Sequence, residues 1–339
     1  MKDYTPLMDF NIPPILTPDQ LMDKAFKRAS KKHKKGSNRK ETTKKTISIK
    51  LNTVAHILED TLKRYEKEFP SIDMLPPFYV DIIDITIGRD QLKKSLGALN
   101  WARRKIKRTL MESARNLMSL ESVDKMQNIQ KGAYGRTASI LRQVSDDLEF
   151  LGEARKKLNS LPDIKTEIPT VVVAGYPNVG KSLLVSKMSS GKPKVAIYPF
   201  TTKEVGIGHF KVGHHICQLL DTPGLLDRPE EERNEIEMQA VRALENLADV
   251  IVFLFDPSET CGYSIEEQES LAKEIKQTFP DIPIIEVENK IDLVKRDNER
   301  LKISSFEETN LEKLKELIEN HLDVDTSLEA IHESFDIDR

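Results

Sequence analysis

The sequence predicts an α + α/β fold, with a bundle of helices over residues 1–165 and a mostly parallel sheet, covered by helices on both faces, over residues 166–322. In the first half, apolar residues recur every three or four positions, as on amphipathic helices. In the second half, short β-branched runs alternate with helical segments, a pattern typical of parallel sheets. The charge changes as well, since residues 1–168 carry 33 Lys and Arg against 22 Asp and Glu, and residues 169–339 carry 19 against 33.

The helical elements of the first half begin at Thr17-Pro18-Asp19-Gln20, where a Thr N-cap with Gln three residues later predicts a helix start. We expect that helix to end at Gly36-Ser37-Asn38, within a partly extended arm over residues 1–45. Apolar spacing predicts further helices over residues 47–65, about 90–120 and about 133–158. Residues 159–169 hold two prolines and little periodicity, which places the domain boundary there.

The second half starts with Thr170–Ala174, a β-branched run that predicts a buried parallel strand. Two runs, Val205–Lys211 and His215–Leu220, predict a hairpin. Further strands are expected at Val250–Phe255, Ile282–Val287 and Leu301–Ile303, and helices near Glu235–Leu247, Ser264–Thr278 and Leu311–Leu322. Residues 323–339 are expected to form a loose acidic tail.

Composition excludes several classes of protein. The longest apolar run, Val250–Phe255, is far too short to span a membrane. Two cysteines, Cys217 and Cys261, cannot build a disulfide framework or a zinc site unaided. With no signal-peptide pattern, we expect a reduced, intracellular, soluble protein without a membrane partner.

A phosphate-binding loop is the strongest motif. Gly175-Tyr176-Pro177-Asn178-Val179-Gly180-Lys181-Ser182 matches G-x-x-x-x-G-K-[ST] between a predicted strand and a predicted helix. Glycines let backbone N–H groups converge on phosphate oxygens, and the helix N-terminus adds partial positive charge. We expect Lys181 to lie along the β- and γ-phosphates, Ser182 to ligate Mg²⁺, and Leu183 to belong to the same site.

The base is indicated by Asn289-Lys290-Ile291-Asp292, at the carboxyl end of the predicted strand Ile282–Val287. An Asp carboxylate accepts two N–H groups from the guanine edge, which adenine does not offer. Unpaired polar groups let such a site reject the wrong base by roughly 10⁴–10⁵. After the last strand, Ser304 and Ser305 are expected to offer backbone N–H groups to the guanine O6.

The γ-phosphate is expected to meet Asp221-Thr222-Pro223-Gly224, which follows the hairpin. Asp221 is expected to hold Mg²⁺ through water and the Gly224 N–H to reach the γ-phosphate, which makes Gly224 part of the catalytic group with Lys181. In the loop Tyr198-Pro199-Phe200-Thr201-Thr202, Thr202 is the favoured third Mg²⁺ residue, with Thr201 as the alternative. Asp256 and Glu259 form no recognisable catalytic pair.

These five elements occur in the order and spacing of Ras-like domains, and GYPNVGKS, YPFTT and DTPGLLD resemble the Obg-like branch of P-loop GTPases. The stretches FPSIDMLPPFYVDIIDI, GRTASILRQVSDDLEFL, RNEIEMQAVRALENLADV and DPSETCGYSIEEQ resemble the Nog group of nucleolar GTP-binding proteins and their archaeal relatives. The resemblance covers roughly residues 50–300. It implies a role in large ribosomal subunit assembly, with an N-terminal helical domain that docks on rRNA. The chain stops soon after the last nucleotide motif, which favours an archaeal-like form.

Hydrolysis is expected to be slow, because Leu225 stands where Ras-type enzymes have the glutamine that orients water. In related GTPases with P-N-x-G-K-S, the residue matching Asn178 helps to bind K⁺ beside the phosphates, which implies a catalytic role for Asn178. The other interpretation is that Asn178 only caps the loop. Activation by a pre-ribosomal particle is a further expectation.

The basic half has 12 Lys and Arg within residues 24–50, against the single acid Glu41. Phosphate contacts supply much of the affinity in such surfaces. The candidate RNA-binding residues are Lys31, Lys32, Lys34, Lys35, Arg39, Lys40, Arg103, Arg104, Lys107 and Arg108. A solvated helix face is the alternative. Trp101 and Tyr134 are expected to be core residues rather than stacking platforms.

Three functions are compatible with the sequence. The first is a GTP-dependent switch for large-subunit assembly, monomeric when free. The second is an RNA-binding scaffold whose GTP/GDP site is regulatory and turns over negligibly. The third is an ATP-using P-loop enzyme, which Asn289 and Asp292 argue against.

Overall fold

The computed structural model describes residues 10–161, 164–197, 204–212 and 215–322. The described residues divide into two compact units. A helical unit lies within Met8–Leu75 and Ile83–Ser160, and a sheet unit lies within Pro76–Ile82 and Leu161–Arg339. The predicted α + α/β fold class is confirmed.

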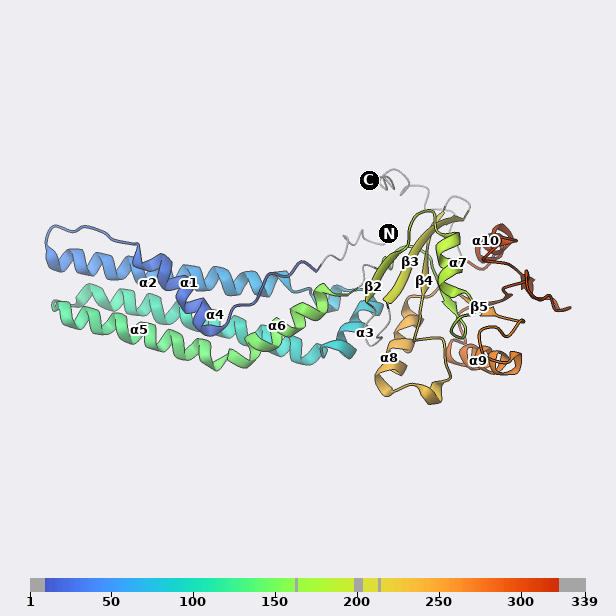
Figure 1. Cartoon of the computed structure of the whole chain (residues 1–339). Helices are drawn as coiled ribbons and strands as arrows, with labels where there is room; N and C mark the ends of the chain where they lie inside the picture. The colour runs from blue at the N-terminus through green and yellow to red at the C-terminus, as the bar shows by residue number, and fades with distance from the viewer. Residues whose placement is uncertain (1–9, 162–163, 198–203, 213–214, 323–339) are drawn as a thin grey trace. The chain divides into compact units, whose positions relative to one another are not determined.

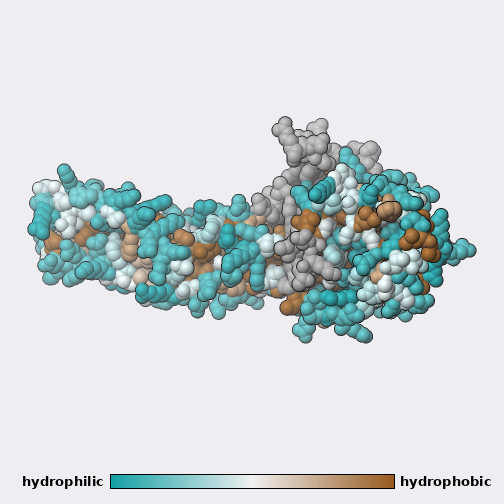
Figure 2. Space-filling model, in the orientation of Figure 1, coloured by the Kyte–Doolittle hydropathy of each residue, from teal (hydrophilic) through white to brown (hydrophobic). Residues whose placement is uncertain are grey.

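The helical unit contains α1 (Pro18–Ser30), α2 (Arg39–Glu68), α4 (Arg89–Asn116), α5 (Val123–Gln143) and α6 (Ser145–Asn159). In Figure 1, α1, α2, α4 and α5 lie side by side as a bundle, with α2 and α4 in the most extensive contact. Leu51, Leu58, Leu99 and Leu110 are fully buried between them. The visible face of this unit is mostly hydrophilic (Figure 2), as the amphipathic pattern requires.

The first two helices differ from the predicted ones at their ends. The Thr17 capping box is present, but α1 ends at Ser30. Asn38, expected near the end of that helix, instead caps α2, because its side chain accepts the Glu41 N–H at 2.8 Å. Residues 18–30 and 39–45 are therefore helical where we expected a partly extended arm over residues 1–45.

The predicted helix over residues 133–158 is wrong, because the segment forms two helices, α5 and α6. The break is at Val144, whose φ and ψ of −109° and 21° leave the helical region. Ile140, Val144 and Leu148 are all buried. Because the four-residue spacing continues through the break, periodicity cannot reveal it.

The sheet unit contains seven strands in the order β2-β3-β4-β1-β5-β6-β7. They are β1 (Thr170–Ala174), β2 (Lys194–Ile197), β3 (Glu204–Val212), β4 (His215–Asp221), β5 (Val250–Phe255), β6 (Ile284–Glu288) and β7 (Leu301–Lys302). Among the described strands, the β2–β3 and β3–β4 pairs are antiparallel and the other pairs are parallel. The β3–β4 hairpin is as predicted, whereas β2 occupies positions where no strand was expected.

The helices of this unit are α7 (Lys181–Met188), α8 (Glu235–Ala243), α9 (Ile265–Thr278) and α10 (Leu311–Glu319). Figure 1 shows α7 and α10 toward one side of the sheet and α8 and α9 toward the other. Strands β1 and β5 are buried at every position. Such complete burial is typical of parallel strands covered on both faces.

Residues 76–82 group with the sheet unit, although we expected residues 1–165 to form one domain. They belong to α3 (Pro77–Thr86) and contain the fully buried Tyr79. The Tyr79 hydroxyl donates to the Ile164 carbonyl at 2.8 Å and accepts the Ile164 N–H at 3.0 Å. Within the described residues, no helix is long and apolar enough to cross a membrane.

Candidate functional site

The loop between β1 and α7 requires glycine at two positions. Gly175 has φ +127°, and a Cβ there would lie 2.6 Å from the Leu254 carbonyl oxygen. Gly180 has φ +106°, and a Cβ there would lie 2.4 Å from the Asn289 amide nitrogen. A larger residue would therefore be strained and would collide with the neighbouring segment. The loop can curl as the motif predicts only because both positions lack side chains.

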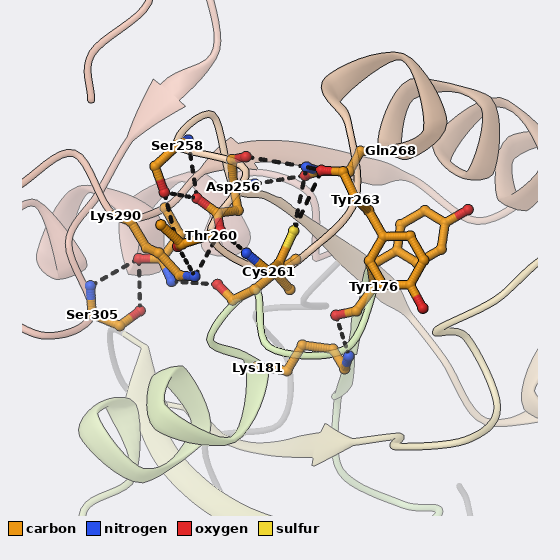
Figure 3. Close-up of polar contacts among 12 residues, drawn as sticks. Tyr176, Lys181, Asp256, Ser258, Thr260, Cys261, Tyr263, Gln268, Lys290 and Ser305 are labelled. Carbon is orange, nitrogen blue, oxygen red and sulfur yellow. Dashed lines mark hydrogen bonds and ion pairs between the residues drawn. The ribbon is translucent and has the colours of Figure 1, made fainter. Parts of the chain in front are cut away.

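Lys181 is buried and bends back over this loop. Its ammonium donates to the carbonyl of Gly175 at 2.6 Å. It also donates to the carbonyl of Tyr176 at 2.8 Å (Figure 3). Both acceptors are neutral carbonyl oxygens of the loop itself, so these hydrogen bonds hold the ammonium against the loop. Asn178, at φ +64°, is exposed, and Leu183 is 39% exposed.

Ser182 and Asp221 lie together although they are 39 residues apart. The Ser182 hydroxyl donates to Asp221 Oδ2, while Asp221 Oδ1 is buried without a hydrogen-bond partner among the residues that the structure describes. Burial raises the pKa of Asp221, although the hydrogen bond from Ser182 and the charge of Lys181 act in the other direction. A buried carboxylate oxygen beside a hydroxyl fits a hard cation such as Mg²⁺.

No cluster of three or more His, Cys, Asp or Glu suited to a metal ion occurs in the described part of the chain. Mg²⁺ commonly takes one or two carboxylates from the protein and its other ligands from phosphates and water. The pair Ser182 and Asp221 fits that mode of binding. Thr201 and Thr202 lie outside the described residues.

Two hydrogen bonds tie the segment after β4 to its surroundings in the sheet unit. The Thr222 hydroxyl donates to the Val173 carbonyl at 3.0 Å, so this buried side chain ties β4 to β1. The Gly224 N–H donates to Asp227 Oδ2 at 2.7 Å. Pro223 is half-buried and Leu225 is fully buried. The group expected to meet a γ-phosphate is therefore bound to a carboxylate that the sequence reasoning missed.

Asn289 connects three segments. Its amide nitrogen donates to the Val179 carbonyl at 2.9 Å, and its oxygen accepts the Ser305 N–H at 2.9 Å and the Ser305 hydroxyl at 3.0 Å. Asp292 is exposed, and its Oδ1 accepts the Ser304 hydroxyl at 2.5 Å. The structure thus brings the predicted base residues next to the phosphate-binding loop.

The Lys290 ammonium is held by the loop after β5. It donates to Asp256 Oδ2 at 2.6 Å and to the Thr260 hydroxyl at 2.9 Å (Figure 3). Asp256 is fully buried and also accepts the Ser258 and Cys261 N–H groups. Burial raises the pKa of Asp256, but hydrogen bonds from Lys290 and Ser258 outweigh it and hold the pKa below its usual value.

The same loop contacts the phosphate-binding loop. The rings of Tyr176 and Tyr263 stack with centroids 3.9 Å apart and planes 21° apart (Figure 3). Sequence reasoning missed both Asp256 and Tyr263. The available signal was the position of Asp256 at the carboxyl end of a central parallel strand, where ligands bind in open α/β sheets.

The candidate RNA-binding residues fall into two groups. Lys31, Lys32, Lys34, Lys35 and Arg39 are exposed, as are Arg104 and Arg108. Lys40 pairs with Glu121, Lys107 with Glu59 at 2.8 Å, and Arg103 lies 3.6 Å from Glu66. These ion pairs connect neighbouring segments of the helical unit.

Trp101, expected in the core, is 44% exposed, so that prediction is wrong. Tyr134 packs on Phe26 with ring centroids 4.7 Å apart.

Two family models match the chain. The NOG1 N-terminal helical domain matches residues 10–165, and Nucleolar GTP-binding protein 1 (NOG1) matches residues 235–292. An uncharacterised protein of Methanocaldococcus jannaschii is 42% identical over 296 residues, which are 86% of this chain and 82% of that protein.

Nucleolar GTP-binding protein 1 of Drosophila melanogaster is 38% identical over 235 residues, which are 69% of this chain and 36% of that protein. The chain thus spans little more than a third of this longer relative. The solved structure of a nucleolar GTP-binding protein 1 from Plasmodium falciparum is 34% identical and covers 48% of this chain and 89% of that chain, with a TM-score of 0.42.

Proposed function

The chain belongs to the nucleolar GTP-binding protein 1 (NOG1) family, and we propose that it is a GTP-hydrolysing switch in the assembly of the large ribosomal subunit. The observation that carries this proposal is the meeting of three segments at one edge of the sheet. Asn289 binds both the phosphate-binding loop and Ser305, while Asp221 contacts the first turn of α7. The residues proposed to bind the phosphates and those proposed to bind the base are therefore neighbours, as the binding of a single nucleotide requires.

In the proposed complex, the loop from Gly175 to Leu183 surrounds the phosphates and Lys181 neutralises the β- and γ-phosphates. Asp292 accepts the N–H groups of the guanine edge, and the Ser304–Ser305 backbone faces the guanine O6. Lys290 and Asn289 keep this wall in place through their hydrogen bonds.

Mg²⁺ is proposed to bind Ser182 and, through water, Asp221, with Thr202 or Thr201 as a further contact. The metal would neutralise phosphate charge during transfer. Asp221 Oδ1 supports this assignment, because a buried carboxylate oxygen without a partner is costly unless a ligand completes it.

Intrinsic hydrolysis is proposed to be slow, because Leu225 is apolar and fully buried, and so offers no group to orient water. Asn178 is exposed on the loop and could contribute to a K⁺ site. The test is GTP turnover in K⁺ and in Na⁺ at equal ionic strength, with Asn178→Ala as the matched variant. Equal rates in both salts would exclude the K⁺ role.

We propose that the helical domain, residues 1–165, docks on rRNA in a precursor of the large subunit. Residues 166–322 are proposed to bind the nucleotide, and residues 323–339 are proposed to form a tail. The exposed lysines at positions 31, 32, 34 and 35 support this, since phosphate contacts need unpaired cations. We further propose a cytoplasmic protein, monomeric when free, with no membrane partner.

The base assignment is tested by Asp292→Asn in the full chain. An amide donates where the carboxylate accepts, so the variant is expected to lose GTP affinity by at least a hundredfold and to gain affinity for xanthosine triphosphate. Asp297→Asn, at a nearby exposed position, is the control. Unchanged GTP affinity in Asp292→Asn would contradict the assignment.

A scaffold with a regulatory nucleotide site is the second candidate, favoured by the burial of Leu225. GTP turnover measured with and without large-subunit particles separates the two. A switch is expected to turn over faster on the particle, whereas a scaffold stays at the basal rate while binding GTP and GDP.

A further inference from the structure

Trp101 is the only tryptophan of the chain and lies in the middle of α4 with 44% of its surface exposed. A large aromatic side chain on a long helix is usually buried against a neighbouring helix. Full burial of a large apolar side chain stabilises a fold by about 1.5–3 kcal/mol. Exposure of the indole in an otherwise well-packed bundle therefore points to a partner outside the unit.

Gly97 lies one turn before Trp101 on the same face of α4. Glycine inside a helix costs about 1 kcal/mol relative to alanine, yet a Cβ at position 97 would meet nothing within 4 Å. No close packing therefore requires glycine here. Because helical side chains lean toward the N-terminus, the Trp101 side chain leans toward the turn that holds Gly97. The absence of a side chain at position 97 leaves the helix surface beside the indole open.

An open hollow of about 560 Å³ lies on the surface of α4 beside the indole. Its lining consists of Gly97, Asn100, Trp101, Arg104, Lys105 and Arg108. All six positions lie on α4, and the spacing of three, four and seven residues from Trp101 puts the three cations on the same face of the helix as the indole.

The basic residues at positions 103–108 of α4 fall into two groups, one that faces α2 and one that is exposed. Arg103 and Lys107 turn toward α2 and reach Glu66 and Glu59 there. Arg104, Lys105 and Arg108 are exposed, and none makes an ion pair with a described residue. Three cations without an ion-pair partner among the described residues thus lie on the C-terminal side of the exposed indole.

We propose that Trp101, Arg104, Lys105 and Arg108 form a stacking site for an unpaired base of RNA. The base would lie against the indole near Gly97, and the cations would bind phosphates of the same strand next to that base. This site rests on the proposed RNA-binding function of the helical domain and names the feature of RNA that it selects. A nucleotide combines a flat aromatic ring with adjacent negative charge, which matches both parts of the surface.

The test uses the intrinsic fluorescence of the full chain, because Trp101 is its only tryptophan. The probes are an RNA hairpin with an unpaired purine loop, a blunt duplex with the same number of phosphates, and poly-glutamate. The hairpin is expected to quench the indole emission. The duplex binds through phosphates without quenching, and poly-glutamate neither quenches nor displaces the hairpin at moderate salt.

Trp101→Ala is expected to weaken hairpin binding by about 5- to 150-fold, the equivalent of the 1–3 kcal/mol typical of one stacked base, and Trp101→Phe to restore most of it. Arg104→Ala and Arg108→Ala are each expected to lower the salt dependence by about one ion. Duplex binding is expected to change in the cation variants and not in Trp101→Ala.

Gly97→Leu fills the hollow while favouring the helix, so it is expected to keep or raise the melting temperature and yet lose hairpin quenching. Gly135→Leu is the matched control, since a Cβ at this helical glycine of α5 also meets open space. It is expected to bind the hairpin normally.

Hairpin binding that is unchanged in both Trp101→Ala and Gly97→Leu would overturn the stacking site while leaving RNA binding intact. Displacement of the hairpin by poly-glutamate with equal quenching would overturn it in favour of an acidic protein partner. Failure of every RNA to bind at low salt, with GTP binding retained, would overturn the RNA-binding part of the proposed function as well.

Discussion

Asp256→Asn is expected to weaken guanine-nucleotide binding without a direct contact to the nucleotide. The Asp256 carboxylate accepts hydrogen bonds from Ser258 at Oδ1 and from Thr260, Cys261 and Lys290 at Oδ2. Asparagine keeps one acceptor oxygen, so either the bonds from Ser258 or those at Oδ2, including the one from Lys290, are lost. Each of these bonds has the charged carboxylate as acceptor and is worth about 1.5–3 kcal/mol, so losing at least two of them lowers the free energy of unfolding by at least about 3 kcal/mol.

The part of this loss that involves Lys290 is expected to appear in nucleotide affinity. A released ammonium no longer holds the segment from Asn289 to Asp292 in place, and about 1.4 kcal/mol of that loss would lower GTP affinity tenfold. The assay is titration with a fluorescent GTP analogue, with ATP competition measured in parallel. Chemical denaturation of the same samples gives the stability.

Ser258→Ala is the matched control, because the Ser258 hydroxyl bonds Asp256 Oδ1 and the Thr260 hydroxyl but makes no hydrogen bond to Lys290 itself. It is expected to lower stability while GTP affinity stays within twofold. If Asp256→Asn retains normal GTP affinity and normal GTP-over-ATP selectivity while losing stability, Asp256 supports the loop alone and the reasoning is refuted.

Three further predictions follow from the hydrogen bonds and pKa shifts. Asp227→Ala removes the acceptor of the Gly224 N–H, so affinity for a non-hydrolysable GTP analogue is expected to rise up to about tenfold relative to affinity for GDP. An unchanged ratio of the two affinities would show that Asp227 does not compete with the γ-phosphate for this N–H. Burial raises the pKa of Asp221, so its charged form costs stability at neutral pH, and Asp221→Asn is expected to raise the melting temperature of the nucleotide-free chain while Mg²⁺-dependent GTP binding is lost. Hydrogen bonds from Lys45 and Ser37 lower the pKa of Glu41 to about 2. The Glu41 carboxylate therefore stabilises the fold fully above pH 4.5, its ordinary pKa, and this stabilisation is lost as the pH falls toward 2. Glu41→Gln is expected to flatten this part of an acid-unfolding curve.

Much of the fold could be read from local patterns. Capping residues such as Thr17, and buried runs such as Val250–Phe255, act on the backbone nearest to them, so one segment carries the whole signal. The break at Val144 could not be read, because the buried face of α5 and α6 keeps the same spacing through it. Strand β2 lies at the edge of the sheet and pairs only with β3, and its four residues carry little pattern of their own.

For the candidate site, the sequence by itself determined the residues whose role depends on the backbone beside them. Gly175 and Gly180 must adopt positive φ angles, and Lys181 and Ser182 must follow at the start of a helix, so a motif of eight residues specifies the loop. The partners across the sheet were decided only by the tertiary structure. Parallel strands bring together chain segments that are far apart in sequence, as when β5 and β6 place Asp256 against Lys290. The same holds for Trp101, whose exposure depends on which face of α4 the other helices cover, a choice made by the packing of the whole bundle.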